Sequence, residues 1–329
     1  MSFKICIAGS VTSTAITLKK IVEHKLDLVG VFGLENVDTT NISGYVNLKE
    51  YIKNPEIKYV PFKSINENNV VQNLKEIQPD ILFVVGLSQL ISEELMGIPK
   101  IATVGFHPTN LPLGRGRAPM AWLILNEKKG AACFFKISAG IDDGPIFIKE
   151  EYDVEEDDDV ASLSVKLENA INCALDKWLP ELRKGKIHFE EQDHSQATYY
   201  GRRAPNDGLI NWYDPAKTID RLIRATTQPY PGAFTYYGDF KIIIWKSEVV
   251  RNNTIKGVIG RVLEKTDPGF LLVQTGENLL LIKEYEVLDY SYNKINDPVL
   301  KVGCRLGYYE QNEIFNLRNE IKEIKKRLK

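Results

Sequence analysis

The stretch Phe3-Lys4-Ile5-Cys6-Ile7-Ala8-Gly9-Ser10 is a short apolar run that ends at a glycine, a pattern typical of a buried β-strand. Apolar residues then recur at helical spacing from Ala15 to Val22, and a second, largely apolar run occupies 26–33. A third run, Ile81-Leu82-Phe83-Val84-Val85, also stops at a glycine. Strands that are apolar on both faces and alternate with helices predict a mostly parallel, Rossmann-like sheet of the α/β class.

The pattern of helices and strands continues to about residue 200, and short strand patterns follow it. A helix is expected over 119–126, strands over 132–137 and 146–154, and a long amphipathic helix from Val160 to Leu182. The acidic run 150–159 leads into that helix, where negative charge suits the helix N-terminus. After 201, short apolar runs separated by Gly, Asn and Asp predict a smaller β domain, expected to be an open, OB-like barrel. The strands expected in it cover 234–237, 241–245, 257–263, 269–274 and 279–288.

These changes divide the chain into a first domain over 1–200, a β domain over 201–309 and an amphipathic helix over 310–329, with the link at 192–211. The helix carries Ile314, Leu317, Ile321, Ile324 and Leu328 at spacings of three and four. Such a short heptad seam fits either a homodimer contact or a helix that folds onto its own domain.

Composition narrows the class of partner. The 329 residues are 43% hydrophobic, and 42 basic against 44 acidic side chains give a formal net charge of −2. That balance does not favour nucleic acid or an anionic membrane, and no stretch reaches the roughly 20 apolar residues of a membrane span. Cys6, Cys133, Cys173 and Cys304 lie far apart, without zinc spacing. We expect a cytoplasmic protein with small-molecule partners and no metal.

One histidine stands out because it lies in a segment rich in Gly, Pro and Arg. His107 precedes Pro108 in the run 104–119, for which we expect an irregular, rigid loop after a strand. An imidazole placed there can accept a proton from a nucleophile, or it can simply pin the loop by a hydrogen bond. Asp142, in the glycine-bounded turn 140–144, can orient the imidazole or be an ordinary turn residue.

Several motifs together resemble the folate-dependent formyltransferases, which use N10-formyltetrahydrofolate as formyl donor. They are His107-Pro108-Thr109-Asn110-Leu111-Pro112, Arg115-Gly116-Arg117-Ala118-Pro119 and Asp142-Asp143-Gly144-Pro145-Ile146. Three more motifs, over 200–212, 223–225 and 229–234, are similar to the formyltransferase domain that acts on UDP-4-amino-4-deoxy-L-arabinose. The resemblance covers Phe3 to about Gly307, so only the amphipathic helix lies outside it.

This resemblance implies formyl transfer to the amine of a nucleotide-linked amino sugar, for surface glycan biosynthesis, in a catalytic first domain. It implies His107 as base and Asp142 as its support. The expected folate-binding residues are Gly86, Leu87, Ser88, Gln89, Leu90, Ile141, Asp143 and Gly144. The expected ligands of the sugar or diphosphate are Ser10, Thr12, Arg115, Arg117, Arg202 and Arg203, because a guanidinium suits phosphate oxygens.

The chain departs from the family pattern at one position. The motif usually reads Asn-x-His, with the amide helping to hold the developing oxyanion, but here Gly105 stands two residues before His107. Loss of one such donor typically costs about 3 kcal/mol of transition-state stabilisation. We expect Asn110, backbone donors or water to take over this task.

Two other functions stay open from the sequence. A methionyl-tRNA formyltransferase has the same two-domain layout, but it would need a basic surface to neutralise phosphates. A folate- or nucleotide-binding module without catalysis is favoured only by Gly105.

Overall fold

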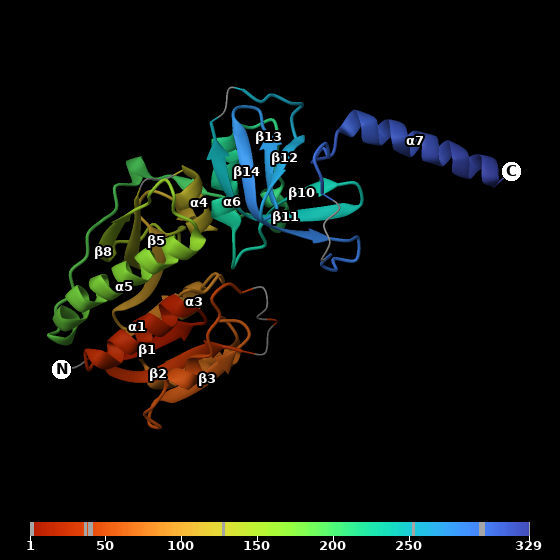
Figure 1. Ribbon diagram of the computed structural model, residues 1–329. Coiled ribbons are helices and arrows are strands. Elements are labelled where there is room, and N and C mark those ends of the chain that lie inside the picture. The colour runs from red at the N-terminus through yellow and green to blue at the C-terminus, as the bar shows by residue number, and fades with distance from the viewer. Residues whose placement is uncertain are drawn as a thin grey trace. The chain divides into compact units, whose positions relative to one another are not determined.

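The structure is a computed structural model that describes residues 3–35, 38, 42–126, 129–251, 254–295 and 300–328. The chain divides into two compact units, 1–203 and 204–329, and each is described by itself (Figure 1). The division falls inside the segment 192–211 that the sequence analysis takes as the link.

The first unit is built on a seven-stranded sheet with the order β3-β2-β1-β4-β5-β7-β8. Strands β1 to β5 run parallel, and only β7 is reversed, since it pairs antiparallel with both β5 and β8, so the expected mostly parallel Rossmann-like sheet is confirmed. The strands are β1 (Lys4–Gly9), β2 (Asp27–Leu34), β3 (Lys58–Phe62), β4 (Ile81–Val85), β5 (Ala102–Thr109), β7 (Lys129–Lys136) and β8 (Ile146–Asp153).

Helices cover both faces of this sheet, as fully apolar strands require. The largest apolar cluster joins one face to α1 (Thr12–Glu23) and α5 (Val160–Arg183), with Trp178 of α5 packed against Phe83 and Phe134. A second cluster lies under α2 (Asn68–Ile77) and α3 (Glu93–Met96). Helix α4 (Pro119–Asn126) contacts α5 and β5.

Local signals place the long helix where the sequence predicts it. Asp159, the last residue of the acidic run, accepts a hydrogen bond from the backbone of Ser162 at 2.9 Å and so caps α5. An aspartate at this position satisfies one of the free amides of the first helical turn and favours the helix dipole.

The second unit is an antiparallel five-stranded sheet, in the order β10-β11-β14-β13-β12, with α6 (Ala216–Thr226) packed mainly on β11. Its strands are β10 (Ala233–Tyr237), β11 (Phe240–Val250), β12 (Val262–Thr266), β13 (Phe270–Gln274) and β14 (Leu279–Leu288). The strand expected at 257–263 begins only at Val262, and residues 257–260 precede it without strand conformation. Helix α7 (Glu310–Arg327) follows.

The position of His107 differs from the expectation. The sequence predicts an irregular loop, but β5 continues through Thr109, and His107 lies within it opposite Cys133 of β7. Pairing with β7 supplies the hydrogen bonds that extend the strand past Gly105, so the loop begins only after Thr109.

Candidate active site

The predicted site segments meet at one edge of the sheet. Gly9 at the end of β1 pairs with Val85 at the end of β4, and Val84 of β4 pairs with Gly105 of β5. The carboxyl ends of adjacent parallel strands therefore bring the segments after Gly9 and Val85 close to His107. Ligands of open α/β sheets typically bind at this edge.

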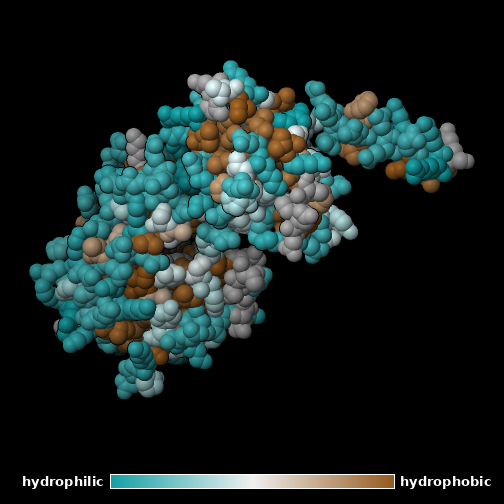
Figure 2. All heavy atoms as spheres, in the orientation of Figure 1, coloured by the Kyte–Doolittle hydropathy of each residue, from teal (hydrophilic) through white to brown (hydrophobic). Residues whose placement is uncertain are grey.

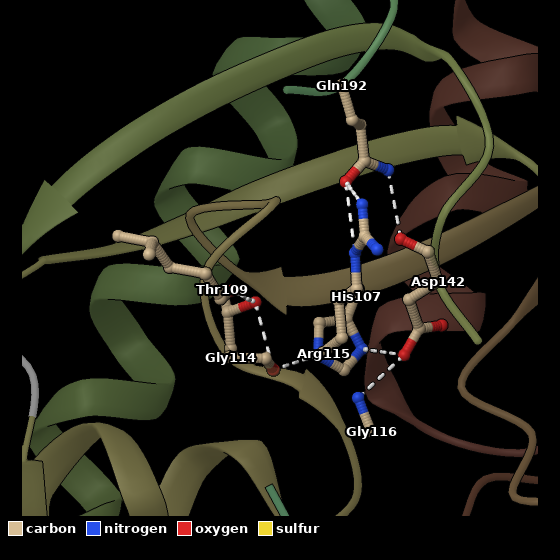
Figure 3. A network of polar contacts seen from close by, with 8 residues as sticks. His107, Thr109, Gly114, Arg115, Gly116, Asp142 and Gln192 are labelled. Carbon is tan, nitrogen blue, oxygen red and sulfur yellow. Dashed lines mark hydrogen bonds and ion pairs between the residues drawn. The ribbon is translucent and has the colours of Figure 1, made fainter. Parts of the chain in front are cut away.

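His107 is held by contacts at both ring nitrogens (Figure 3). Its Nε2 lies 2.9 Å from the carbonyl oxygen of Gly114, and its Nδ1 lies 3.6 Å from Oδ2 of Asp142. A carbonyl can only accept, so Nε2 carries the hydrogen and donates it. Nδ1 is then the atom left to accept a proton, and it faces a carboxylate.

Asp142 is fixed from a strained turn. It adopts a positive φ of 50°, a conformation that non-glycine residues seldom occupy, and Oδ2 accepts a hydrogen bond from the backbone of Gly116 at 2.9 Å. The side chain is 21% exposed, whereas that of His107 is 7% exposed. Asp142 thus presents its carboxylate to the imidazole and keeps partial access to solvent.

Sequence reasoning missed Gln192, which holds the Asp142 turn. Its Nε2 donates to the carbonyl oxygens of Asp142 and Gly144, at 2.9 and 2.7 Å. Its Oε1 accepts from Nη2 and Nε of Arg115, at 2.7 and 3.3 Å (Figure 3). A glutamine in a linker carries no signal of this role in the sequence, because the contact spans about fifty residues.

Arg115 is placed differently from a phosphate ligand. The residue is 1% exposed, and its guanidinium also donates to the hydroxyl of Tyr199 at 2.9 Å and to Nδ1 of His194 at 3.1 Å. Within the described part of the chain, no carboxylate forms an ion pair with it. These contacts direct Arg115 toward the protein interior, where it joins Gln192 in supporting the site.

The other three arginines expected to bind phosphate are grouped by a short parallel ladder. Strands β6 (Arg115–Gly116) and β9 (Tyr199–Tyr200) pair, and the backbone of Arg117 donates to the carbonyl of Tyr200 at 3.1 Å. Arg202 follows two residues later and is exposed, as is Arg117. The guanidinium of Arg203 lies 5.1 Å from the ring centre of Trp122. The ladder therefore brings two arginine-bearing segments together that are more than 80 residues apart.

The segment after β4 presents unpaired backbone groups. Gly86 turns the chain with a φ of 63°, and among the described residues the backbone amides and carbonyls of Leu87, Ser88 and Gln89 have no hydrogen-bond partner. The side chain of Gln89 is engaged, because it accepts from the backbone of Ile65 at 2.7 Å and donates to the carbonyl of Lys63 at 3.0 Å. The free edge is thus the backbone.

The segment after β4 and the turn 140–144 each carry an exposed apolar side chain. Leu90 is 88% exposed and Ile141 is 58% exposed. Beyond Asp142, the carboxylate of Asp143 accepts from the hydroxyl of Ser138, and Gly144 packs so tightly that an added Cβ would lie 1.8 Å from the carbonyl oxygen of Lys136. The turn 140–144 therefore has a fixed backbone with an apolar residue at its surface.

Ser10 directly follows β1, and Thr12 is the first residue of α1. Ser10 is buried, and Thr12 donates from its backbone to the carbonyl of Gly44 at 3.0 Å.

Gly105 stands where the family motif usually has an asparagine, and Asn110 is the residue expected to replace its amide. A Cβ added at Gly105 would lie 2.9 Å from both Phe135 and Ile137, so apolar side chains fill the space beside this glycine. Asn110 donates its side-chain amide to Glu151 at 2.9 Å. The donor that the sequence proposes as a substitute is therefore engaged by a residue of β8.

The thiol that β7 places opposite His107 is unreactive. Cys133, directly opposite His107, is fully buried, and burial raises the pKa of its thiol to about 12. A thiol of that pKa stays protonated at neutral pH and is a poor nucleophile.

Within the described ranges, no three His, Cys, Asp or Glu side chains gather as a metal site, and no helix is long and apolar enough to cross a membrane.

Family models match both units of the chain: "Formyl transferase" over residues 29–179 and "Formyl transferase, C-terminal domain" over residues 203–290. The chain belongs to the formyl transferase family. It is a formyltransferase with both domains that this family's models describe.

Solved structures share the fold. The sugar 3N-formyl transferase WlaRD, solved with dTDP and 5-N-formyl-THF, aligns with a TM-score of 0.62 and 20% identity over 91% of this chain and 100% of WlaRD. Methionyl-tRNA formyltransferase from Clostridium thermocellum gives 0.55 and 20% over 87% of this chain and 99% of that one. HypX from Aquifex aeolicus gives 0.60 and 16% over 88% of this chain, which spans about half (48%) of HypX.

Proposed function

We propose that this formyltransferase transfers the formyl group of N10-formyltetrahydrofolate to the amine of a nucleotide-linked amino sugar, a UDP- or dTDP-linked 4-amino sugar by preference. The observation that carries the proposal is the pair formed by Nδ1 of His107 and Oδ2 of Asp142. Membership of the formyl transferase family indicates that a formyl group is transferred. The His107–Asp142 pair indicates what kind of nucleophile accepts it.

The pair consists of two hydrogen-bond acceptors that face each other. Since Nε2 of His107 donates to Gly114, a neutral imidazole turns a lone pair toward the Asp142 carboxylate across 3.6 Å. Such an arrangement is favourable only when a donor or a proton lies between the two acceptors. A primary amine has two N–H groups and so fits both atoms.

The proton of the attacking amine then has a defined acceptor. As the amine nitrogen forms its bond to the formyl carbon, Nδ1 of His107 takes the proton, and the resulting imidazolium faces the carboxylate of Asp142. Asp142 stays oriented because Gly116 donates to it and Gln192 holds its turn. The bond between the formyl carbon and N10 of the folate would break in the same transfer, and N10 would take the proton held by His107. Tetrahydrofolate then leaves, and the imidazole returns to its neutral form.

Two segments fit a pterin. The unpaired backbone of Leu87 to Gln89 offers alternating donors and acceptors, as the edge of a pterin requires, and Leu90 and Ile141 offer apolar surface to its ring. For the acceptor, we assign the diphosphate to Arg117, Arg202 and Arg203, with Ser10 and Thr12 beside the sugar. We infer a reaction in the cytoplasm, where the four free thiols stay reduced.

The test is turnover with N10-formyltetrahydrofolate and three kinds of acceptor: UDP-4-amino sugars, dTDP-amino sugars and methionyl-tRNA. We expect tetrahydrofolate release only with a sugar nucleotide. Turnover with methionyl-tRNA alone would overturn the assignment, and binding of nucleotide and folate without turnover would make the chain a binding module.

The role of His107 is tested in the same assay. His107→Asn should lower turnover by about 10²- to 10⁴-fold, the usual range for a lost general base, and leave nucleotide binding unchanged. The matched control is His188→Asn, since His188 is exposed and is not among the contacts of His107. Full turnover in His107→Asn would refute proton transfer to Nδ1.

A further inference from the structure

Helix α7 carries an apolar row that its own chain leaves uncovered. None of its described residues is buried, and the row is at least half exposed throughout: Ile314 51%, Leu317 54%, Ile321 50%, Ile324 55% and Leu328 82%. Figure 2 shows apolar side chains interspersed on the mostly hydrophilic surface of this helix. The structure does not show the alternative that the helix packs onto its own domain.

The row has the spacing of a coiled-coil seam. Ile314, Ile321 and Leu328 occupy the a positions of a heptad, and Leu317 and Ile324 occupy the d positions. The first heptad has isoleucine at a and leucine at d, the pattern that favours two parallel strands, whereas Ile324 at d and Leu328 at a do not follow it. A seam of little more than two heptads is marginal for an isolated peptide, so the charges beside it have a large share in the choice of partner.

Those flanking charges are complementary to a second copy in one orientation. The g positions hold Glu313 and Glu320, and the e positions hold Arg318 and Lys325. In a parallel, in-register pair, each g residue faces the e residue of the next heptad of the partner, so Glu313 meets Arg318 and Glu320 meets Lys325. Within the described residues, none of these four has an ion-pair partner in its own chain.

The antiparallel orientation is disfavoured by the same residues. It places g opposite g and e opposite e, which sets Glu320 against Glu320 and Arg318 against Arg318 of the two copies. The third g residue, Arg327, then meets Glu313, so attraction and repulsion offset each other, whereas in the parallel orientation every pair attracts. A membrane surface is also a poor match, because the acidic g residues Glu313 and Glu320 lie beside the seam and would be repelled by anionic lipid.

We propose that α7 pairs with α7 of a second copy of this chain as a parallel, in-register, two-stranded coiled coil. This inference is independent of the proposed function, because none of its residues belongs to the candidate site. It assigns the exposed seam one occupant and gives the flanking charges a defined role.

Charge exchange tests the pairing in the full-length protein. In one variant, Glu313→Lys and Glu320→Lys make the g positions basic; in another, Arg318→Glu and Lys325→Glu make the e positions acidic. Each variant alone should be a monomer at concentrations where the unchanged protein is a dimer, with the half-dissociation concentration raised by about tenfold or more. An equimolar mixture should regain the dimer, since all four pairs become attractive again.

Light scattering coupled to size exclusion reads out mass, and Lys322→Glu with Lys326→Glu is the matched control at b and f positions outside the seam. We expect this control to stay a dimer. A monomeric unchanged protein, a trimer, or a mixture that does not regain the dimer would overturn the proposal.

Orientation has its own test. With Cys173, the exposed native thiol, replaced by serine, Leu317→Cys should form an intermolecular disulfide rapidly, because d positions of two parallel copies adjoin. Asn319→Cys at an f position, outside the seam and its flanking charges, is the control and should crosslink more slowly. Equal rates, or no crosslink at position 317, would refute the parallel register.

Discussion

Gln192→Leu is the most direct test of how the site is supported. The change keeps side-chain volume but removes two donors, to the carbonyls of Asp142 and Gly144, and the acceptor of two Arg115 N–H groups. Gln192 is 6% exposed and Arg115 is 1% exposed, so solvent can replace these bonds only in part. An unsatisfied buried polar group costs about 1–3 kcal/mol, which puts the total loss at roughly 3–6 kcal/mol of unfolding free energy.

Gln192→Leu should also lower turnover. Release of the turn lets the Asp142 carboxylate move from its place 3.6 Å from the imidazole, and a displacement of about 1 Å typically lowers turnover about 10²-fold. Gln192→Glu should recover much of the stability through an ion pair with Arg115. It should not recover turnover, since a carboxylate cannot donate to the two carbonyls.

Urea unfolding gives the stability and tetrahydrofolate release gives the turnover, both measured below the melting temperature of each variant. Gln196→Leu is the matched control, because Gln196 is exposed and lies four residues away. If Gln192→Leu keeps both its unfolding free energy and its turnover within experimental error of the control, the supporting role of Gln192 is refuted.

Three further changes have defined outcomes. Gly144→Ala should cost about 1–3 kcal/mol of unfolding free energy, because its Cβ would lie 1.8 Å from the Lys136 carbonyl; an unchanged urea midpoint would contradict this close approach. Gly105→Asn should destabilise the protein by a similar amount without raising turnover; increased turnover in this variant would show that the apolar filling is not an obstacle. Burial disfavours the charge on Asp158, but the Lys166 ion pair and hydrogen bonds from Ser162 and the backbone of Glu155 outweigh it and lower the pKa of that carboxyl. Its stabilisation is present above the ordinary aspartate pKa and lost as pH falls through the lowered one, so Asp158→Asn should cost about 2 kcal/mol at pH 7 and progressively less as the pH is lowered, a difference that pH-dependent urea unfolding would measure.

The sequence predicts the sheet well because its signals are local. Apolar strands such as Ile81–Val85 and the helix from Val160 can be read from short windows, and both lie where they were expected. The extension of β5 past Gly105 could not be predicted in the same way, since it depends on pairing with β7, about thirty residues later. His107 is therefore a strand residue, although its Pro-rich surroundings indicate a loop.

The candidate site shows the same contrast. The motif residues His107 and Asp142 were found from spacing and resemblance, and the structure brings their side chains to 3.6 Å. Gln192 was not found, because its importance follows only from four contacts made across the fold. The environment of Arg115 was also hidden, since the sequence cannot distinguish an arginine that turns inward from one that faces solvent.

The ladder between β6 and β9 has a consequence for synthesis of the chain. A nascent protein that ends before Gln192 already contains all seven strands of the first sheet and the helices that cover it. It lacks Thr198, which accepts from the backbone of Gly114 and Arg115, and it lacks the ladder itself. The sheet and its helices are therefore all synthesised before the residues that bind the segment 114–117 of the candidate site.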